Sequence, residues 1–247
     1  MFELLDQAQQ LHRETGGAFD ITAGCLSKIW GFYRREGRVP EDEELAQALR
    51  QVGSQHFELD AAMSTIRFLR EGLELNLGAI GKGYALDRCA NFMVADGVAD
   101  FLIHGGTSSI LGRGSRAELN SNQSGWSVAL KHPLRPDERL AEIWLRDRAL
   151  GTSGAGNQFF FHRGQRYGHI LDPRSGRPAS GVLSSTVIAP RAAMADALST
   201  AFYVGGLALA QSYCDAHPDI AALLITPAAR AGEVELHRFN FSEELSS

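Results

Sequence analysis

The stretch from Tyr167 to Gly206 reads YGHILDPRSGRP (167–178), then VLSSTVIAP (182–190), then MADALSTAFYVGG (194–206). The middle run is apolar and β-branched and predicts a strand. The last run predicts a helix in which Asp196 and Thr200 share one face. A carboxylate and a hydroxyl that point the same way are hard oxygen ligands of the kind Mg²⁺ prefers. The pair alone also fits a first-turn acid beside a buried Thr, and this structural interpretation is the favoured one for the pair by itself.

A second stretch, GAIGKG (78–83), carries three glycines and a lysine before a predicted helix that runs to about Gly97. Glycines let the backbone approach a ligand closely, and the exposed N–H groups of a helix N-terminus attract phosphate. Lys82 would add a positive charge to such a seat. The spacing matches neither the P-loop pattern nor the dinucleotide-binding GxGxxG pattern. On its own this stretch is compatible with a phosphate contact, and a purely structural glycine turn is the favoured interpretation.

Elsewhere, short predicted strands mix irregularly with helices, which favours an α+β fold over a doubly wound sheet. No internal repeat, low-complexity segment or linker is visible, so we expect one domain over residues 1–247. The predicted helices cover 2–14, 22–33, a segment after Pro40, a segment ending near 97, 191–204 and 207–216. Two hairpins are predicted, one formed by 56–60 with 65–69 and one over about 159–171. Further strands are predicted at 75–77, twice within 99–114, and at 126–130, 139–146, 149–153, 221–226 and 234–239. Residues 115–125 are expected to form a loop.

Composition excludes several classes of function. The chain has 247 residues, a net charge of −5 and no Lys/Arg-rich run, so we expect no nucleic-acid binding. No apolar run reaches the roughly 18 residues that a membrane span needs, and no signal peptide is expected. The three cysteines, Cys25, Cys89 and Cys214, are far apart, which argues against a disulfide framework or a zinc site.

Four stretches together resemble one family. TGGAFDIT (15–22), LGAIGKGYALD (77–87), HILDPRSGRP (169–178) and ADALSTA (195–201) are similar, in this order, to the motifs of the ApbE-type FAD:protein FMN transferases. Those enzymes depend on Mg²⁺, cleave FAD at its diphosphate and attach FMN to a Thr or Ser of an acceptor protein, with release of AMP. The resemblance implies a flavin-transferase fold of mixed sheets and helices, with two lobes around a flavin and Mg²⁺ site. It also implies FAD as substrate and an acceptor flavoprotein, expected in a redox complex, as partner.

The resemblance also implies roles for individual residues. The Mg²⁺ ligands would be the backbone carbonyl of Ala79, the Asp196 carboxylate and the Thr200 hydroxyl, with Ser199 as a weaker further ligand. The FAD contacts would be Ala18, Phe19, Asp20, Asn76, Lys82 and Ser185.

His169 is the candidate catalytic residue. The acceptor hydroxyl must lose a proton as it attacks, and an imidazole with an ordinary pKa of about 6.5 suits that task. Whether His169 takes the proton or orients the phosphate stays open. Asp172 could orient His169 or begin the Asp-Pro turn, and the turn is the favoured interpretation.

Three features depart from the family pattern. Asn76 and Thr107 stand where acids are usual, and the usual N-terminal strand is missing, so the chain is N-terminally short for the family. Two alternatives to protein flavinylation therefore stay open: a Mg²⁺-dependent FAD diphosphatase that yields FMN and AMP, and a non-catalytic FAD-binding paralogue. We expect a cytoplasmic protein as the chain stands, and a periplasmic or membrane-anchored one if an N-terminal segment is missing.

Overall fold

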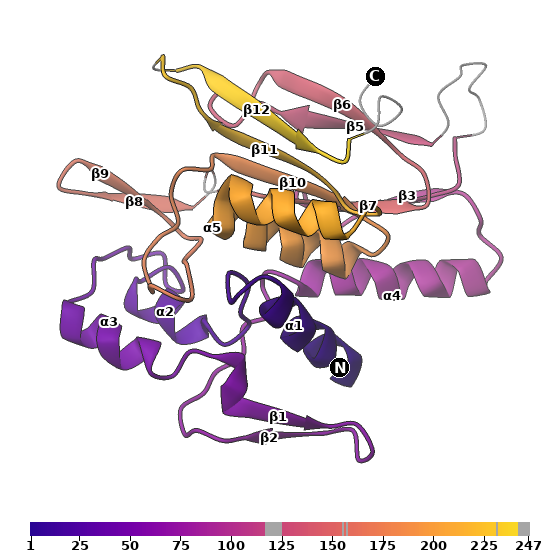
Figure 1. Ribbon diagram of the computed structural model, residues 1–247. Helices are drawn as coiled ribbons and strands as arrows, with labels where there is room; N and C mark the ends of the chain where they lie inside the picture. The colour runs from indigo at the N-terminus through magenta and orange to yellow at the C-terminus, as the bar shows by residue number, and fades with distance from the viewer. Residues whose placement is uncertain (117–124, 155, 157, 231, 242–247) are drawn as a thin grey trace. The chain divides into compact units, whose positions relative to one another are not determined.

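The computed structural model describes residues 1–116, 125–154, 156, 158–230 and 232–241 (Figure 1). Its contacts divide the chain into two compact units. Unit 1 consists of residues 1–79 and 155–180, and unit 2 of residues 80–154 and 181–247. Each unit is therefore discontinuous in sequence and is described here by itself.

Unit 2 is built on a six-stranded antiparallel sheet with the order β12-β11-β10-β7-β4-β3. Consecutive strands are thus not always neighbours, because β10 pairs with β7 across the intervening chain. The strands are β3 (Phe101–His104), β4 (Ser109–Arg113), β7 (Arg148–Ser153), β10 (Ser184–Ala189), β11 (Ala221–Pro227) and β12 (Val234–Phe239).

Two helices lie on one face of this sheet, α4 (Gly81–Ala95) and α5 (Ala192–Ala216), as Figure 1 shows. A glycine of the sheet lets α5 come close: a Cβ on Gly151 would lie 2.4 Å from the Ala195 backbone. The predicted break between two helices is confirmed at Gly206, whose φ of 71° interrupts α5. By length and hydropathy α5 could also span a membrane, but its first twelve residues are almost all buried, as in a core helix.

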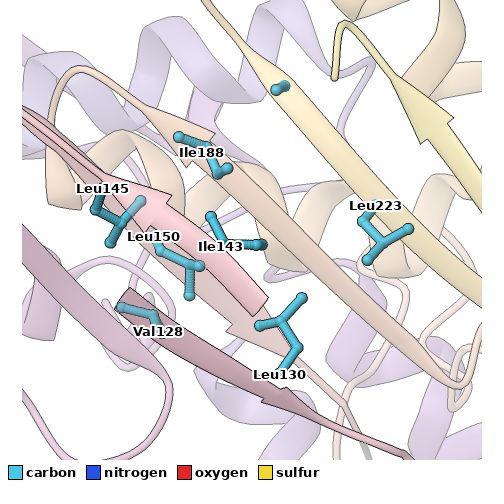
Figure 2. Packing of buried hydrophobic residues seen from close by; sticks show 8 residues of the cluster. Val128, Leu130, Ile143, Leu145, Leu150, Ile188 and Leu223 are labelled. Carbon is cyan, nitrogen blue, oxygen red and sulfur yellow. The ribbon is translucent and has the colours of Figure 1, made fainter. Parts of the chain in front are cut away.

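The opposite face of the sheet is covered by the hairpin of β5 (Trp126–Lys131) and β6 (Arg139–Leu145). Side chains on a strand alternate between faces, so Leu150 points away from α5 while Gly151 points toward it. Figure 2 shows the apolar cluster that results, which includes Ile143 and Leu145 of the hairpin and Ile188 of β10. Each such fully buried side chain contributes about 1.5–3 kcal/mol. This layer closes the face of the sheet opposite α5.

Unit 1 contains mostly short elements. They are α1 (Phe2–Glu14), α2 (Gly24–Ile29), α3 (Asp42–Leu49), a 3₁₀ turn η1 (Ser54–His56), and the hairpins β1 (Phe57–Asp60) with β2 (Thr65–Phe68) and β8 (Phe159–His162) with β9 (Gln165–Gly168). Trp30 is 1% exposed and donates its indole N–H to the Gly176 carbonyl at 2.7 Å. Phe160 and Tyr167 stack across the β8–β9 hairpin at 5.3 Å and pack on Trp30.

Most predicted elements are confirmed, and two are wrong. The predicted strand at 75–77 is not a strand, because the Asn76 side chain accepts a hydrogen bond from the Gly78 amide at 2.8 Å and forms a local turn instead. The helix predicted over 22–33 is shorter: Gly31 has a φ of 72° and ends it. Of the loop predicted at 115–125, residues 117–124 lie outside the described residues.

Candidate active site

Asp196 lies at the centre of the polar region on the helix side of unit 2. Only 5% of the surface of Asp196 is exposed to solvent. The Gly83 amide at the start of α4 donates to Oδ2 at 2.7 Å, and the Ser109 hydroxyl at the start of β4 donates to Oδ1 at 2.6 Å. Burial raises the pKa of Asp196, while these two hydrogen bonds and the charge of Lys82 act to lower it. The carboxylate is therefore held at a fixed place by three elements, α4, α5 and β4.

Besides that of Ser109, three hydroxyl groups lie close to Asp196. Ser199 donates to the Asp196 carbonyl at 2.8 Å, and its Oγ lies 2.9 Å from Oγ of Ser153. The Ser153 hydroxyl also lies 2.9 Å from Oγ1 of Thr200. The structure thus brings together the predicted residues Asp196, Ser199 and Thr200. It adds Ser109 and Ser153, which sequence reasoning missed because both lie far away along the chain.

This donor set fits Mg²⁺. Each carboxylate oxygen of Asp196 accepts one hydrogen bond from the described residues, and a carboxylate oxygen can accept more than one. A carboxylate buried with hydroxyl neighbours is the hard oxygen environment that Mg²⁺ prefers. Among the residues that the structure describes, no group of three or more His, Cys, Asp or Glu side chains could hold a metal. Unit 2 therefore offers few protein ligands, as in sites where substrate phosphates complete the coordination of Mg²⁺.

Lys82 lies one residue inside the N-terminus of α4, and its side chain is exposed. Its ammonium group donates to the hydroxyl of Ser108, which immediately precedes β4. The exposed N–H groups at the start of a helix and a neighbouring ammonium both favour an anion. This region can therefore receive a phosphate beside the Asp196 carboxylate.

Ser185, a predicted FAD contact, lies on β10 opposite Ser153 of β7. It is fully buried, and its hydroxyl has no hydrogen-bond partner within the described part of the chain. Cross-strand partners point to the same face, so Ser185 shares the α5 side of the sheet with Ser153. The protein itself encloses this hydroxyl, and the contact of Ser185 with FAD stays a prediction.

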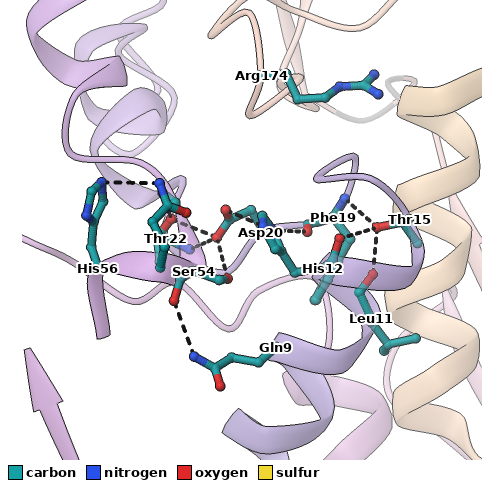
Figure 3. Close-up of polar contacts among 12 residues, drawn as sticks. Gln9, Leu11, His12, Thr15, Phe19, Asp20, Thr22, Ser54, His56 and Arg174 are labelled. Carbon is teal, nitrogen blue, oxygen red and sulfur yellow. Dashed lines mark hydrogen bonds and ion pairs between the residues drawn. The ribbon is translucent and has the colours of Figure 1, made fainter. Parts of the chain in front are cut away.

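The segment Ala18-Phe19-Asp20 is buried in unit 1, with Ala18 1% and Phe19 2% exposed. Figure 3 shows the polar network around it. Asp20 accepts hydrogen bonds from the amide and hydroxyl of Thr22 at 2.8 and 2.7 Å, and Nδ1 of His12 lies 3.1 Å from its Oδ2. These side chains are occupied inside the unit, so a contact of this segment with FAD would use its backbone. That contact stays a prediction.

The pair of His12 and Asp20 gives a pH-dependent contribution to stability. The hydrogen bond with Asp20 raises the pKa of His12; burial alone would raise the pKa of Asp20, but the bonds from His12 and Thr22 outweigh it and lower that pKa. The histidine contribution is complete below about pH 6.5 and is lost as pH rises through the raised pKa. The aspartate contribution is present above about pH 3.9 and is lost as pH falls through the lowered pKa.

We therefore expect the melting temperature of the wild-type chain to fall between pH 6 and pH 8. In His12→Asn this fall should be absent, because the variant lacks the imidazole that loses its proton. The measurement is thermal unfolding followed by circular dichroism at half-unit pH steps. His56→Asn is the control, because that histidine lies in the same unit but makes no contact with Asp20. Identical pH profiles for wild type and His12→Asn would contradict this account of the network.

Asn76 and Ala79 lie in the segment that leads to the glycine turn. The backbone amide of Asn76 donates to the Ile21 carbonyl at 2.6 Å, and its side-chain oxygen accepts a hydrogen bond from the Gly78 amide. Asn76 therefore shapes the turn that leads to Ala79. Thr107 is exposed between β3 and β4, and Nδ1 of His104 bonds the Gly106 carbonyl at 3.1 Å, a structural contact. The roles predicted for Asn76 with FAD and for Ala79 with Mg²⁺ stay predictions.

His169 directly follows β9 in unit 1. Its Nδ1 lies 3.1 Å from the carbonyl oxygen of Gln158, and its ring meets that of Phe32 edge-on at 6.4 Å. A carbonyl can only accept, so Nδ1 carries the proton and the neutral imidazole has its lone pair on Nε2. This tautomer is the one that can take a proton at Nε2. Asp172, in contrast, accepts from the amide and the guanidinium of Arg174 and forms the predicted turn.

Comparisons with known proteins agree with this picture. A sequence profile described as the ApbE family matches residues 1–224. The chain is 32% identical over 240 residues to the FAD:protein FMN transferase of Treponema pallidum, covering 93% of this chain and 66% of that protein. It is 32% identical over 219 residues to the FAD:protein FMN transferase of Salmonella typhimurium, covering 85% of this chain and 61% of that protein. The chain thus spans slightly less than two thirds of the length of these curated relatives.

Solved structures are similar as well. The ApbE protein of Thermotoga maritima superposes with a TM-score of 0.82 at 32% identity, over 95% of this chain and 74% of that one. The apo form of the flavinyl transferase ApbE of Pseudomonas stutzeri gives 0.81 at 28% identity, over 97% of this chain and 75% of that one. These similarities confirm the predicted α+β flavin-transferase fold.

Proposed function

The chain belongs to the ApbE family, and we propose that it transfers FMN from FAD to a Thr or Ser hydroxyl of an acceptor protein, with release of AMP. The relatives named FAD:protein FMN transferase support this activity. Because the chain spans only part of their length, the activity, the substrate FAD and the acceptor flavoprotein are all parts of the proposal.

One observation carries the proposal: the Asp196 carboxylate is buried, and each of its oxygens accepts one strong hydrogen bond, from Gly83 and from Ser109. Burial is unfavourable for a carboxylate, and here it outweighs the two hydrogen bonds and the charge of Lys82, so that the pKa of Asp196 is raised. A bound cation would remove that penalty. We therefore assign the Mg²⁺ ligands to Asp196 and Thr200, with the Ala79 carbonyl and the weaker Ser199 as further ligands.

Bound Mg²⁺ would withdraw charge from the diphosphate of FAD and stabilise the leaving AMP. The residues of the chain position the reacting groups and handle the proton. Lys82 and the N-terminus of α4 bind phosphate oxygens, and the Ser185 hydroxyl and the backbone of residues 18–20 contact the rest of FAD. Asn76 holds the glycine turn and contacts FAD as well.

The reaction is a displacement at the phosphorus of the FMN moiety. The acceptor oxygen forms a bond to that phosphorus as the bond to the AMP oxygen breaks, and AMP leaves with the bonding electron pair. His169 accepts the proton of the acceptor hydroxyl at Nε2, while the Gln158 carbonyl holds the proton on Nδ1. The imidazole later releases the acquired proton to water.

Product analysis tests the proposal against its two alternatives. The purified chain is incubated with FAD and Mg²⁺, with and without an acceptor that carries a Thr or Ser flavinylation site, and the products are separated by chromatography. AMP that appears together with acceptor-bound FMN supports the transferase. Free FMN and AMP formed without acceptor would show a diphosphatase, and intact bound FAD would show a binding protein; either outcome would overturn the proposal.

A further inference from the structure

Asp87 on α4 caps the first turn of α5 from a neighbouring helix. Its Oδ1 accepts from the Ala192 amide at 2.8 Å, and its Oδ2 accepts from the Ala193 amide at 3.0 Å. Arg191, the residue at the N-cap of α5, makes no side-chain capping bond of its own. The first amides of a helix have no partner within the helix. Asp87 supplies two of those partners, and its negative charge lies at the positive end of the helix.

Gly83 lies one helical turn before Asp87 and makes the second contact between these two helices. Its amide donates to Oδ2 of Asp196, and a Cβ at this position would lie 2.1 Å from the Ala192 carbonyl oxygen. Residues four apart lie on one helix face, so Gly83 and Asp87 present a single edge of α4 to α5. That edge holds α5 at residues 192–193 and again at Asp196.

Two contacts one turn apart fix both the position and the rotation of a helix, whereas one contact would fix only its position. The rotation of α5 decides where Asp196 and Thr200 point, because both lie within the next two turns. The side chain of Asp87 is 12% exposed, and Nε of Arg191 lies 3.9 Å from its Oδ2. Its bonds to α5 are thus shielded from water and are not an incidental surface contact.

We propose that Asp87 is a positioning residue for the metal site: it fixes the rotation of α5 so that the Asp196 carboxylate and the Thr200 hydroxyl face the ion. This inference rests on the proposed function and assigns a role to a side chain that does not itself reach the ion. Removal of residues that orient metal ligands typically weakens metal binding about 10- to 100-fold.

The test measures the affinity for Mn²⁺, an EPR-active substitute for Mg²⁺, in the presence of ADP as the diphosphate. Asp87→Asn keeps the shape and one acceptor oxygen but faces the second amide with an NH₂ group. We expect its Kd for Mn²⁺ to rise about 10-fold and that of Asp87→Ala to rise further. Hydrogen exchange should show faster exchange of the Ala192 and Ala193 amides in both variants.

A matched control separates positioning from general stability. Ile143→Val and Ile143→Ala loosen the apolar cluster on the opposite face of the sheet. One should lower the melting temperature less than the Asp87 variants do, and the other more. We expect both Ile143 variants to bind Mn²⁺ like the wild type. If the Asp87 variants only lower the melting temperature and keep the wild-type Kd, Asp87 is merely a helix cap and the inference is overturned.

Asp196→Asn separates this inference from the proposed function. If the wild type binds Mn²⁺ and Asp196→Asn does not, the metal site stands, and the Asp87 variants decide the positioning role alone. If the wild type takes up no Mn²⁺ in the presence of ADP, or Asp196→Asn binds it equally well, the proposed metal site fails and the positioning role fails with it.

Discussion

Asp196→Asn is expected to lower the rate of FMN transfer at least about 10³-fold, which corresponds to about 4 kcal/mol of transition-state stabilisation. The asparagine has one acceptor oxygen for two donors, Gly83 and Ser109, and carries no charge for a cation. The measurement is the initial rate of acceptor flavinylation at saturating FAD and Mg²⁺. Circular dichroism checks that the variant is folded.

Asp137→Asn is the matched control for this variant. Asp137 is an exposed acid in the connection between β5 and β6 of the same unit, and its replacement should leave the rate within about twofold of wild type, as is usual for a surface change. Mg²⁺ should raise the melting temperature of wild type and of Asp137→Asn but not of Asp196→Asn. A folded Asp196→Asn protein with a wild-type rate would refute the metal assignment.

His169→Asn is expected to lower kcat by about 10²–10⁴-fold, the usual contribution of a general base. Asparagine can still donate to the Gln158 carbonyl, so the local structure should persist without a group that takes a proton. Initial rates of flavinylation at varied FAD concentrations measure kcat and KM.

His162→Asn serves as the control for His169→Asn. His162 is an exposed histidine at the end of β8 in the same hairpin, and its loss should change neither kcat nor KM. A His169→Asn variant with unchanged kcat and a raised KM for FAD would instead assign His169 to phosphate orientation. An unchanged kcat with an unchanged KM would remove His169 from the mechanism.

The sequence predicted the part of the site whose residues lie close together on one helix. Asp196 and Thr200 are four residues apart, so helical periodicity alone places them on one face, and the structure keeps them there on α5. The break at Gly206 was likewise predictable, because a pair of glycines weakens a helix locally. The order of strands in unit 2 was not predictable, since the pairing of β10 with β7 depends on tertiary packing.

The partners of Asp196 could not be predicted from the sequence. Ser109 lies 87 residues and Gly83 lies 113 residues away along the chain, and nothing in their local sequence indicates a common neighbour. Asp87 is similar: its position on α4 is compatible with a surface acid, and only the packing of two helices shows it to be a cap. The strand predicted around Asn76 was wrong for a local reason, because the side chain of Asn76 bonds the Gly78 amide and forms a turn there.

In-gel fluorescence of an acceptor protein tests the central claim most directly. The chain is incubated with FAD, Mg²⁺ and an acceptor, either intact or with its target Thr or Ser replaced by Ala, and the products are separated under denaturing conditions. We predict a fluorescent band for the intact acceptor only, lost in EDTA and in the Asp196→Asn enzyme. No band on an intact acceptor that a related transferase does flavinylate, with the chain folded and FAD present, would contradict the account.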